Sequence, residues 1–191
     1  MKTKSKALIL SVCALLLVAA TVLLTMAFLT STDSVNNTFT VGKVKITLDE
    51  AKVSDMGVVD TTATSRVKAN TYKLIPGHTY VKDPTVHVDA TSEDSWLFVK
   101  LENGLVDIID NTTIEAQMAA NGWTAVSGKT GVYAYKNIVK ANDNVPVFGS
   151  FTLKGDADVA SYANAKISVT AYAIQADGFA TSADAAAQLT F

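Results

Sequence analysis

The sequence has very little cysteine, arginine or histidine, and each shortage removes a class of function. The single cysteine, Cys13, lies in an apolar run near the N-terminus, so the rest of the chain has no thiol, disulfide or cysteine-ligated metal site. Arg66 is the only arginine, and 16 basic residues stand against 18 acidic ones. Because no basic stripe is present, we expect no binding to DNA or RNA.

Motifs for catalysis are also missing. The chain has no Gly-x-Ser-x-Gly elbow and no phosphate-binding glycine loop. Its two histidines, His78 and His87, are nine residues apart and cannot form the His-Glu-x-x-His pattern of zinc peptidases. We expect both to be solvated surface residues, with Glu93 and Asp94 as ordinary loop carboxylates. The sequence therefore predicts no enzyme, no cofactor and no metal site.

One group of residues is the best candidate in the chain for oxygen ligands of calcium. It consists of Asp143 and Asn144 with Asp156 and Asp158. The stretch GDADVAS lacks the ladder of ligands found in a calcium loop, so these residues are expected to be solvated in turns.

The N-terminus reads as an export signal. Lys2, Lys4 and Lys6 precede a run without charge from Ala7 to Leu29. At about 1.5 Å per helical residue the run spans roughly 35 Å, enough to cross a hydrocarbon core of about 30 Å. The lysines keep the N-terminus cytoplasmic, so the remainder is exported.

Small residues near the end of this run favour cleavage by a signal peptidase. Thr25 and Ala27 occupy the positions three and one residues before a cut between Ala27 and Phe28. We expect residues 1–27 to be a signal peptide, with a retained membrane anchor as the alternative. A lipoprotein site at Cys13 has only a loose match in the preceding Leu10-Ser11-Val12. Cleavage leaves 13 basic residues against 18 acidic ones, a net charge of −5.

Most of the exported part alternates as strands do. In FTVGKVKITL, residues 39–48, Val44, Ile46 and Leu48 share one face. Phe39 and Val41 have the opposite parity, and a bulge at Gly42 would return them to the same face. The other predicted strands are Arg66–Leu74, Thr85–Ala90, Trp96–Glu102, Trp123–Val126, Val132–Lys136, Val145–Leu153 and Lys166–Ala176.

About eight short strands separated by turn signals predict a mainly β fold, an antiparallel two-sheet sandwich or jelly roll. Two short helices interrupt it. One is expected from about Thr113 to Asn121, closed by Gly122, and the other from Thr181 to Gln188. We expect residues 28–38 to be a flexible arm and residues 39–191 to be one domain.

Aromatic residues are expected to be structural. Trp96 and Phe98 share one parity of a strand that is also apolar on its other face, so that strand should be central and covered on both sides. Tyr133 and Tyr135 alternate in the same way and are assigned to the core. A tyrosine stripe that binds sugar is the alternative.

Three stretches resemble a known family. They are AFLTSTDSVNNTFTVGKVKITLDE at residues 27–50, LIPGHTYVKDPTVHVDATSEDSWLFVKLENG at 74–104 and ISVTAYAIQADGF at 167–179. Together with the lysine-led leader they are similar to the TasA and camelysin family, exported proteins of Gram-positive bacteria that a dedicated signal peptidase processes. Residues 107–155 carry no matching motif.

This resemblance implies a jelly-roll subunit that assembles into cell-surface or biofilm-matrix fibres, in which the N-terminal arm of one subunit adds a strand to its neighbour. The partners would be further copies of the chain, the signal peptidase, and other matrix or cell-wall components, with membrane contact only through an uncleaved leader. An adhesion or carbohydrate-binding module and a camelysin-like metallopeptidase are the alternatives. The apolar residues available for strand donation are Phe28, Leu29, Val35, Phe39 and Val41.

Overall fold

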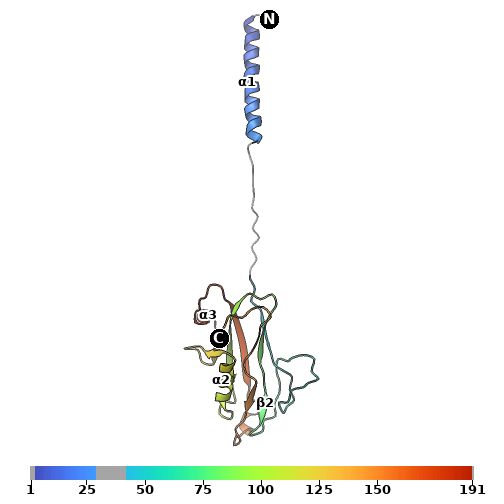
Figure 1. The fold of residues 1–191 in the computed structure, drawn as a ribbon, viewed down its shortest axis with the longest axis vertical. Coiled ribbons are helices and arrows are strands. Elements are labelled where there is room, and N and C mark those ends of the chain that lie inside the picture. Colours follow the sequence, from blue (N-terminus) through green and yellow to red (C-terminus); the bar gives the residue numbers. More distant parts are fainter. Residues whose placement is uncertain (1–2, 29–41, 191) are drawn as a thin grey trace. The chain divides into compact units, whose positions relative to one another are not determined.

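The computed structural model describes residues 3–28 and 42–190 (Figure 1). The chain divides into two compact units, Met1–Thr40 and Val41–Phe191. The described part of the first unit is one helix, α1 (Thr3–Phe28). Its segment Thr3–Ala20 is long and apolar enough to cross a membrane, a property that signal sequences share with membrane anchors. The predicted cleavage residues, Ala27 and Phe28, are the last two residues of α1.

The second unit is mainly β, and all its strand pairs are antiparallel. Three sheets form, with the strand orders β1-β3-β7, β2-β8 and β5-β6-β4-β9. The strands are β1 (Ile46–Asp49), β2 (Thr79–Val81), β3 (Thr85–Val88), β4 (Ser95–Asn103), β5 (Trp123–Ala125), β6 (Val132–Tyr135), β7 (Asn144–Pro146), β8 (Ser150–Thr152) and β9 (Ile167–Gln175).

The first strand confirms the predicted alternation. Val44, Ile46 and Leu48 are half-buried, whereas Lys45 and Thr47 are exposed. Alternation of this kind places one face of β1 on the core and leaves the other in water. The proposed bulge at Gly42 concerned residues 39 and 41, which lie outside the described residues.

The prediction of a central, doubly covered strand is confirmed by β4. It lies between β6 and β9, and its nine residues pair with all nine residues of β9. Leu97 and Val99 are fully buried in the main core, while Phe98 is fully buried on the opposite face. Helix α3 (Ser182–Gln188) covers that opposite face through Ala185 and Ala186.

The main core draws on every sheet of the unit. Its buried members include Val86 from β3, Val145 from β7, Leu97 from β4, and Tyr80 stacked on Phe151 at 5.0 Å between ring centroids. One apolar cluster therefore holds the three sheets together, as the predicted lack of disulfides requires.

Both short helices are confirmed. Helix α2 (Asn111–Ala120) is followed by Gly122, whose φ of +91° is the left-handed conformation expected of a helix-ending glycine. Helix α3 is capped by Thr181, whose side chain accepts from the backbone N–H of Asp184 while the Asp184 carboxylate accepts from the N–H of Thr181. This reciprocal pair is a capping box.

Three strand predictions need correction. Residues 66–74 form no strand; the segment makes one isolated bridge, between Val67 and Glu50, one further backbone bond from the N–H of Lys73 to the oxygen of Asp55 at 2.8 Å, and side-chain contacts. The expected strand over 145–153 is divided into β7 and β8, which belong to different sheets and are separated by residues 147–149, which form no strand. The sequence did not predict strand β2, because it has only three residues and begins two residues after the Pro76-Gly77 turn.

Candidate functional site

Among the described residues, strand β9 forms one edge of the four-stranded sheet and has no strand on its outer side. The N–H of Gly104 donates to the oxygen of Lys166 at 2.8 Å, and the N–H of Ala176 donates to the oxygen of Asp94 at 2.7 Å. The β9-side residues of both bonds, Lys166 and Ala176, are even-numbered. Because hydrogen-bonded pairs alternate along an antiparallel strand pair, the even-numbered residues of β9 direct their N–H and C=O groups toward β4. The odd-numbered residues direct theirs to the opposite side. They are Ile167, Val169, Ala171, Ala173 and Gln175.

None of these outward N–H and C=O groups makes a hydrogen bond within residues 42–190. The strand that carries them, ISVTAYAIQ, has no charged residue, no proline and no glycine. Its side chains are mostly half-buried, with Ile167, Val169, Ala171 and Ala173 packed on the main core. An edge that is long, uncharged and unpaired is the kind of surface to which another strand adds.

The other sheet edges are shorter or obstructed. On β7 the outward positions are Asn144 and Pro146; Pro146 has no N–H, and its oxygen accepts a bond from Trp123 Nε1 at 2.9 Å. On β1 the outward oxygen of Leu48 accepts a bond from Lys68 Nζ at 2.5 Å, and the next outward residue, Glu50, pairs with Val67. Strand β5 has only three residues. The edge of β9 therefore stands apart from these edges in its length and in the number of its backbone groups that are unpaired within residues 42–190.

The start of the described domain lies at the C-terminal end of this edge. The oxygen of Lys43 accepts a bond from the N–H of Glu93, and the neighbouring Asp94 pairs with Ala176. Strand β1 also comes within 8 Å of β9, measured between Cα atoms. Hydrogen-bonded strands lie about 4.8 Å apart, so an added strand needs free space directly beside β9. It can therefore pair only with the part of the β9 edge that β1 does not occupy.

The predicted donor residues can be placed only in part. Phe28 is the last residue of α1, and Leu29, Val35, Phe39 and Val41 lie outside the described residues. The acceptor edge was not singled out from the sequence, although a signal for it was present: nine residues without charge or proline near the C-terminus.

Both histidines differ from the expectation that they would be solvated. His78 is half-buried, its Nε2 lies 3.0 Å from the oxygen of Met56, and its ring packs edge-on against Tyr80. His87 is also half-buried; its Nε2 lies 2.9 Å from Asp49 Oδ1, and its Nδ1 contacts Asn144 Oδ1. The two rings lie in separate polar environments rather than in one site.

A cluster of polar side chains surrounds His87. Arg66 Nε donates to Asp49 Oδ1 at 2.5 Å, and Arg66 Nη1 donates to Asp83 Oδ2 at 3.0 Å. Burial alone would raise the pKa of Asp49, but hydrogen bonds and charge from Arg66 and His87 lower it below its ordinary value. This cluster ties the segment around residue 66 to β1 and β3.

No group of three or more metal-ligating side chains gathers among the residues that the structure describes. Residues of the calcium cluster considered above serve turns instead. Asp143 Oδ2 accepts from the N–H of Lys140, and Asp158 Oδ1 accepts from the N–H of Ala160.

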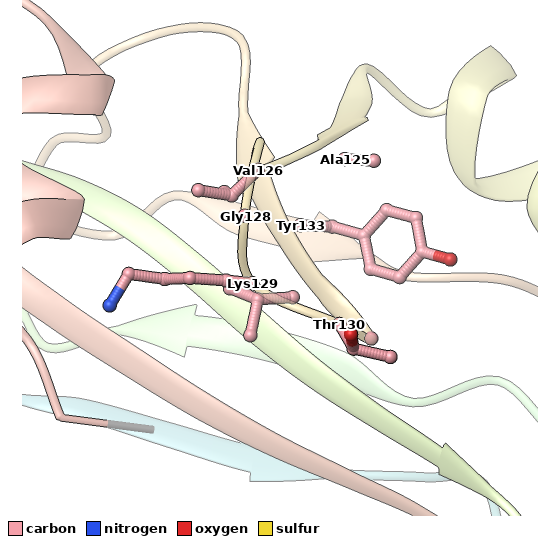
Figure 2. Close-up of a pocket in the computed structure, with 8 residues that line it drawn as sticks. Ala125, Val126, Gly128, Lys129, Thr130 and Tyr133 are labelled. Carbon is pink, nitrogen blue, oxygen red and sulfur yellow. The ribbon is translucent and has the colours of Figure 1, made fainter.

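The tyrosine pair belongs to the core. Tyr133 and Tyr135 pack against the main cluster, and the ring of Tyr135 lies 5.3 Å from that of Trp123. Beside Tyr133, a concavity of about 340 Å³ opens at the turn between β5 and β6 (Figure 2). The residues lining it are Ala125, Val126, Gly128, Lys129, Thr130, Gly131, Val132 and Tyr133. Figure 2 shows the Tyr133 ring as the one aromatic side chain that lines it.

Comparison with known proteins finds no match among protein-family models, curated proteins or solved structures.

Proposed function

We propose that the exported part of this chain is a structural subunit of a cell-surface or biofilm-matrix fibre. In this assembly the residues after the cleavage point, Phe28 to Val41, pair with the open edge of β9 in the next subunit. In this proposal the three sheets of the domain make up the two layers of a jelly-roll sandwich, and the domain acts as a building block and not as an enzyme. The observation that carries the proposal is the unpaired backbone ladder on β9.

Strand addition matches the chemistry of both partners. The edge presents five N–H and five C=O groups that are unpaired within residues 42–190. The arm supplies the complementary backbone groups, together with apolar side chains at residues 28, 29, 35, 39 and 41. Main-chain hydrogen bonds would provide affinity, and pockets for alternate side chains would provide register.

Export is part of the same proposal. An apolar helix precedes the domain, and cleavage between Ala27 and Phe28 would release the arm with a free N-terminus. If α1 instead stays attached, the protein is a membrane-anchored subunit. N-terminal sequencing of the protein recovered from the cell surface and from the medium distinguishes the two forms.

Electron microscopy tests the assembly. Purified residues 28–191 are expected to form fibres that lengthen with protein concentration, and a variant that begins at residue 40 is expected to remain monomeric. Fibres that persist unchanged in the shortened variant contradict strand donation. A monomer at high concentration in both samples would mean that the arm completes its own domain.

Metal and activity measurements address the enzyme alternative. Purified protein is expected to contain no stoichiometric zinc and to leave casein uncleaved. Chelator-sensitive cleavage would favour a metallopeptidase over a structural subunit.

A further inference from the structure

Glu50 is a buried carboxylate that holds an amine and an amide at the same time. Lys82 Nζ lies 2.6 Å from Glu50 Oε2, and Asn70 Nδ2 donates to Glu50 Oε1 at 3.0 Å. The side chains of Lys82 and Glu50 are only 12% and 5% exposed. The Lys82 amine is a nucleophile and the Asn70 amide is a group that it can attack. Both contact Glu50, which can carry a proton between them.

Hydrogen bonds hold both the oxygen and the nitrogen of the Asn70 amide. Its oxygen, Oδ1, accepts a hydrogen bond from the backbone N–H of Val53 at 3.0 Å. Its nitrogen, Nδ2, donates to the oxygen of Ala51 at 2.8 Å as well as to Glu50. The N–H of Val53 thus polarises the carbonyl and faces the oxygen on which negative charge develops when a nucleophile adds.

Backbone contacts hold the three side chains together. Glu50 and Val67 exchange both backbone hydrogen bonds, at 2.9 and 2.8 Å, which brings the segment carrying Asn70 alongside residues 51–53. The N–H of Ala51 donates to Asp83 Oδ1 at 2.6 Å, which holds the residue next to Lys82. These contacts fix the site before any reaction, as efficient intramolecular chemistry requires.

Tyr72 lies close to Glu50, Asn70 and Lys82. Its hydroxyl donates to the oxygen of Val81 at 3.1 Å. Burial, followed by the negative charge of Glu50, raises the pKa of the Tyr72 phenol. The ring stays neutral and does not compete with Glu50 for the proton of Lys82.

We propose that Lys82 and Asn70 join in an intramolecular amide cross-link, with Glu50 as the proton carrier. Glu50 accepts a proton from the Lys82 ammonium, and the neutral amine attacks Cγ of Asn70. Glu50 passes that proton to Nδ2, the Cγ–Nδ2 bond breaks, and ammonia leaves. The second proton lost by Nζ ends on Glu50, so the products are a secondary amide, ammonia and a neutral carboxylic acid.

No oxidant, metal or cofactor is needed for this reaction, since neither carbon nor nitrogen changes its oxidation state. The site also gains electrostatically, because a buried ion pair is replaced by neutral groups that cost less to keep out of water. The cross-link fastens the irregular segment around residue 70, which forms no strand, to the chain at the end of β2.

Peptide mapping of the full-length chain tests the proposal. Trypsin normally cuts after Lys68, Lys73 and Lys82. The cross-link blocks the last of these cuts, so we expect a branched product in which residues 69–73 are joined to residues 74–100 with the loss of one ammonia. Formation of a succinimide at Asn70 also releases ammonia, but it leaves the peptides linear. Finding only the linear peptides 69–73 and 74–82 overturns the proposal.

Variants assign the roles, and the wild-type map does not depend on their folding. Lys82→Met and Asn70→Ala are expected to abolish the branched product. Glu50→Gln keeps hydrogen-bonding groups but cannot accept the proton, so the product is expected to be lost in a chain whose circular dichroism matches that of the wild type. A branched product that persists in Glu50→Gln overturns the role of Glu50. Lys52→Met is the matched control, because Lys52 pairs with Asp60 in an exposed bridge at 3.0 Å and should leave the product unchanged.

Discussion

The indole Nε1 of Trp123 donates a hydrogen bond to the carbonyl oxygen of Pro146 at 2.9 Å, and this bond joins the edges of two different sheets. Trp123 begins β5 at one edge of the four-stranded sheet, and Pro146 ends β7 at one edge of the three-stranded sheet. Pro146 offers no N–H, and its outward oxygen is already used. This side of the domain is therefore closed to strand addition, in contrast to β9.

Replacing Trp123 with Phe is expected to cost about 1–2 kcal/mol of unfolding free energy. Phenylalanine keeps much of the buried ring but removes the donor, and a hydrogen bond of this kind contributes about 1 kcal/mol. Urea unfolding of the two proteins measures the difference.

Trp96→Phe is the control for this substitution. Trp96 Nε1 lies 3.4 Å from the oxygen of Phe179, a longer and weaker bond, and Trp96 is only partly buried. The cost should be smaller than at Trp123. Equal costs at the two sites would show that the bond to Pro146 contributes little to stability.

Asp49 should make the domain less stable in acid. Its pKa in the folded protein is lowered, because hydrogen bonds and charge from Arg66 and His87 outweigh the effect of burial. The unfolded chain therefore takes up the proton first. The contribution of Asp49 is fully present above the ordinary pKa of about 4 and is lost as the pH falls through the lower folded value.

Urea midpoints measured between about pH 6 and pH 3 check this prediction. The midpoint of the wild type should fall over the acidic part of this range, and Asp49→Asn should show a shallower fall. Arg66→Gln should flatten the curve as well, because it removes one donor to the carboxylate. A wild-type slope unchanged in Asp49→Asn would assign the acid sensitivity to other carboxylates.

The sequence predicted those elements that have a clear local pattern. Strand β1 follows from a period-two alternation, β4 from a run that is apolar on both faces, and α3 from its Ser/Thr start and alanine run. It failed at residues 66–74, where the pattern resembles a strand but polar contacts of Arg66 and Asn70 hold the chain in place of a ladder. Propensity alone does not report which backbone groups find partners.

The candidate sites depended on information that local patterns do not contain. Glu50, Asn70 and Lys82 are separated by 20 and 12 residues and share no spacing motif; the pairing of Glu50 with Val67 and the bond from Ala51 to Asp83 bring them together. The prediction that both histidines are solvated was wrong for the same reason, because no local pattern shows which side chains reach them from other parts of the chain. His87 lies on the polar face of its strand as predicted, but Asp49 and Asn144 reach it from the neighbouring strands.

Removing the cap of α3 should loosen its cover on the sheet. Thr181→Ala deletes the side chain that accepts from the N–H of Asp184, and loss of such a cap costs about 1 kcal/mol. Hydrogen exchange of the amides in α3 should accelerate more than that of β4. Thr181→Ser keeps the hydroxyl and is expected to restore most of the protection. Equal exchange in all three proteins would mean that the packing of Ala185 and Ala186, rather than the cap, holds the helix.

A proline in β9 separates the proposed role of its open edge from the role of the strand in folding. Ala171 directs its N–H away from β4, so Ala171→Pro removes an outward donor without deleting a bond of the internal ladder. Thr170, one residue earlier, directs its N–H at Lys100 of β4, and Thr170→Pro removes that bond. The two substitutions differ by a single position and act on opposite edges of the same strand.

Ala171→Pro is expected to stay folded, with a circular dichroism spectrum like that of the wild type, while sedimentation and electron microscopy show strongly reduced fibre formation. Thr170→Pro is expected to lose about 3 kcal/mol of stability or more, because a ladder hydrogen bond is broken in the interior of the sheet. Fibres of normal length and number in folded Ala171→Pro would show that the edge of β9 is not the acceptor. Assembly would then have to use a different edge, such as that of β1, the first strand after the arm in the sequence.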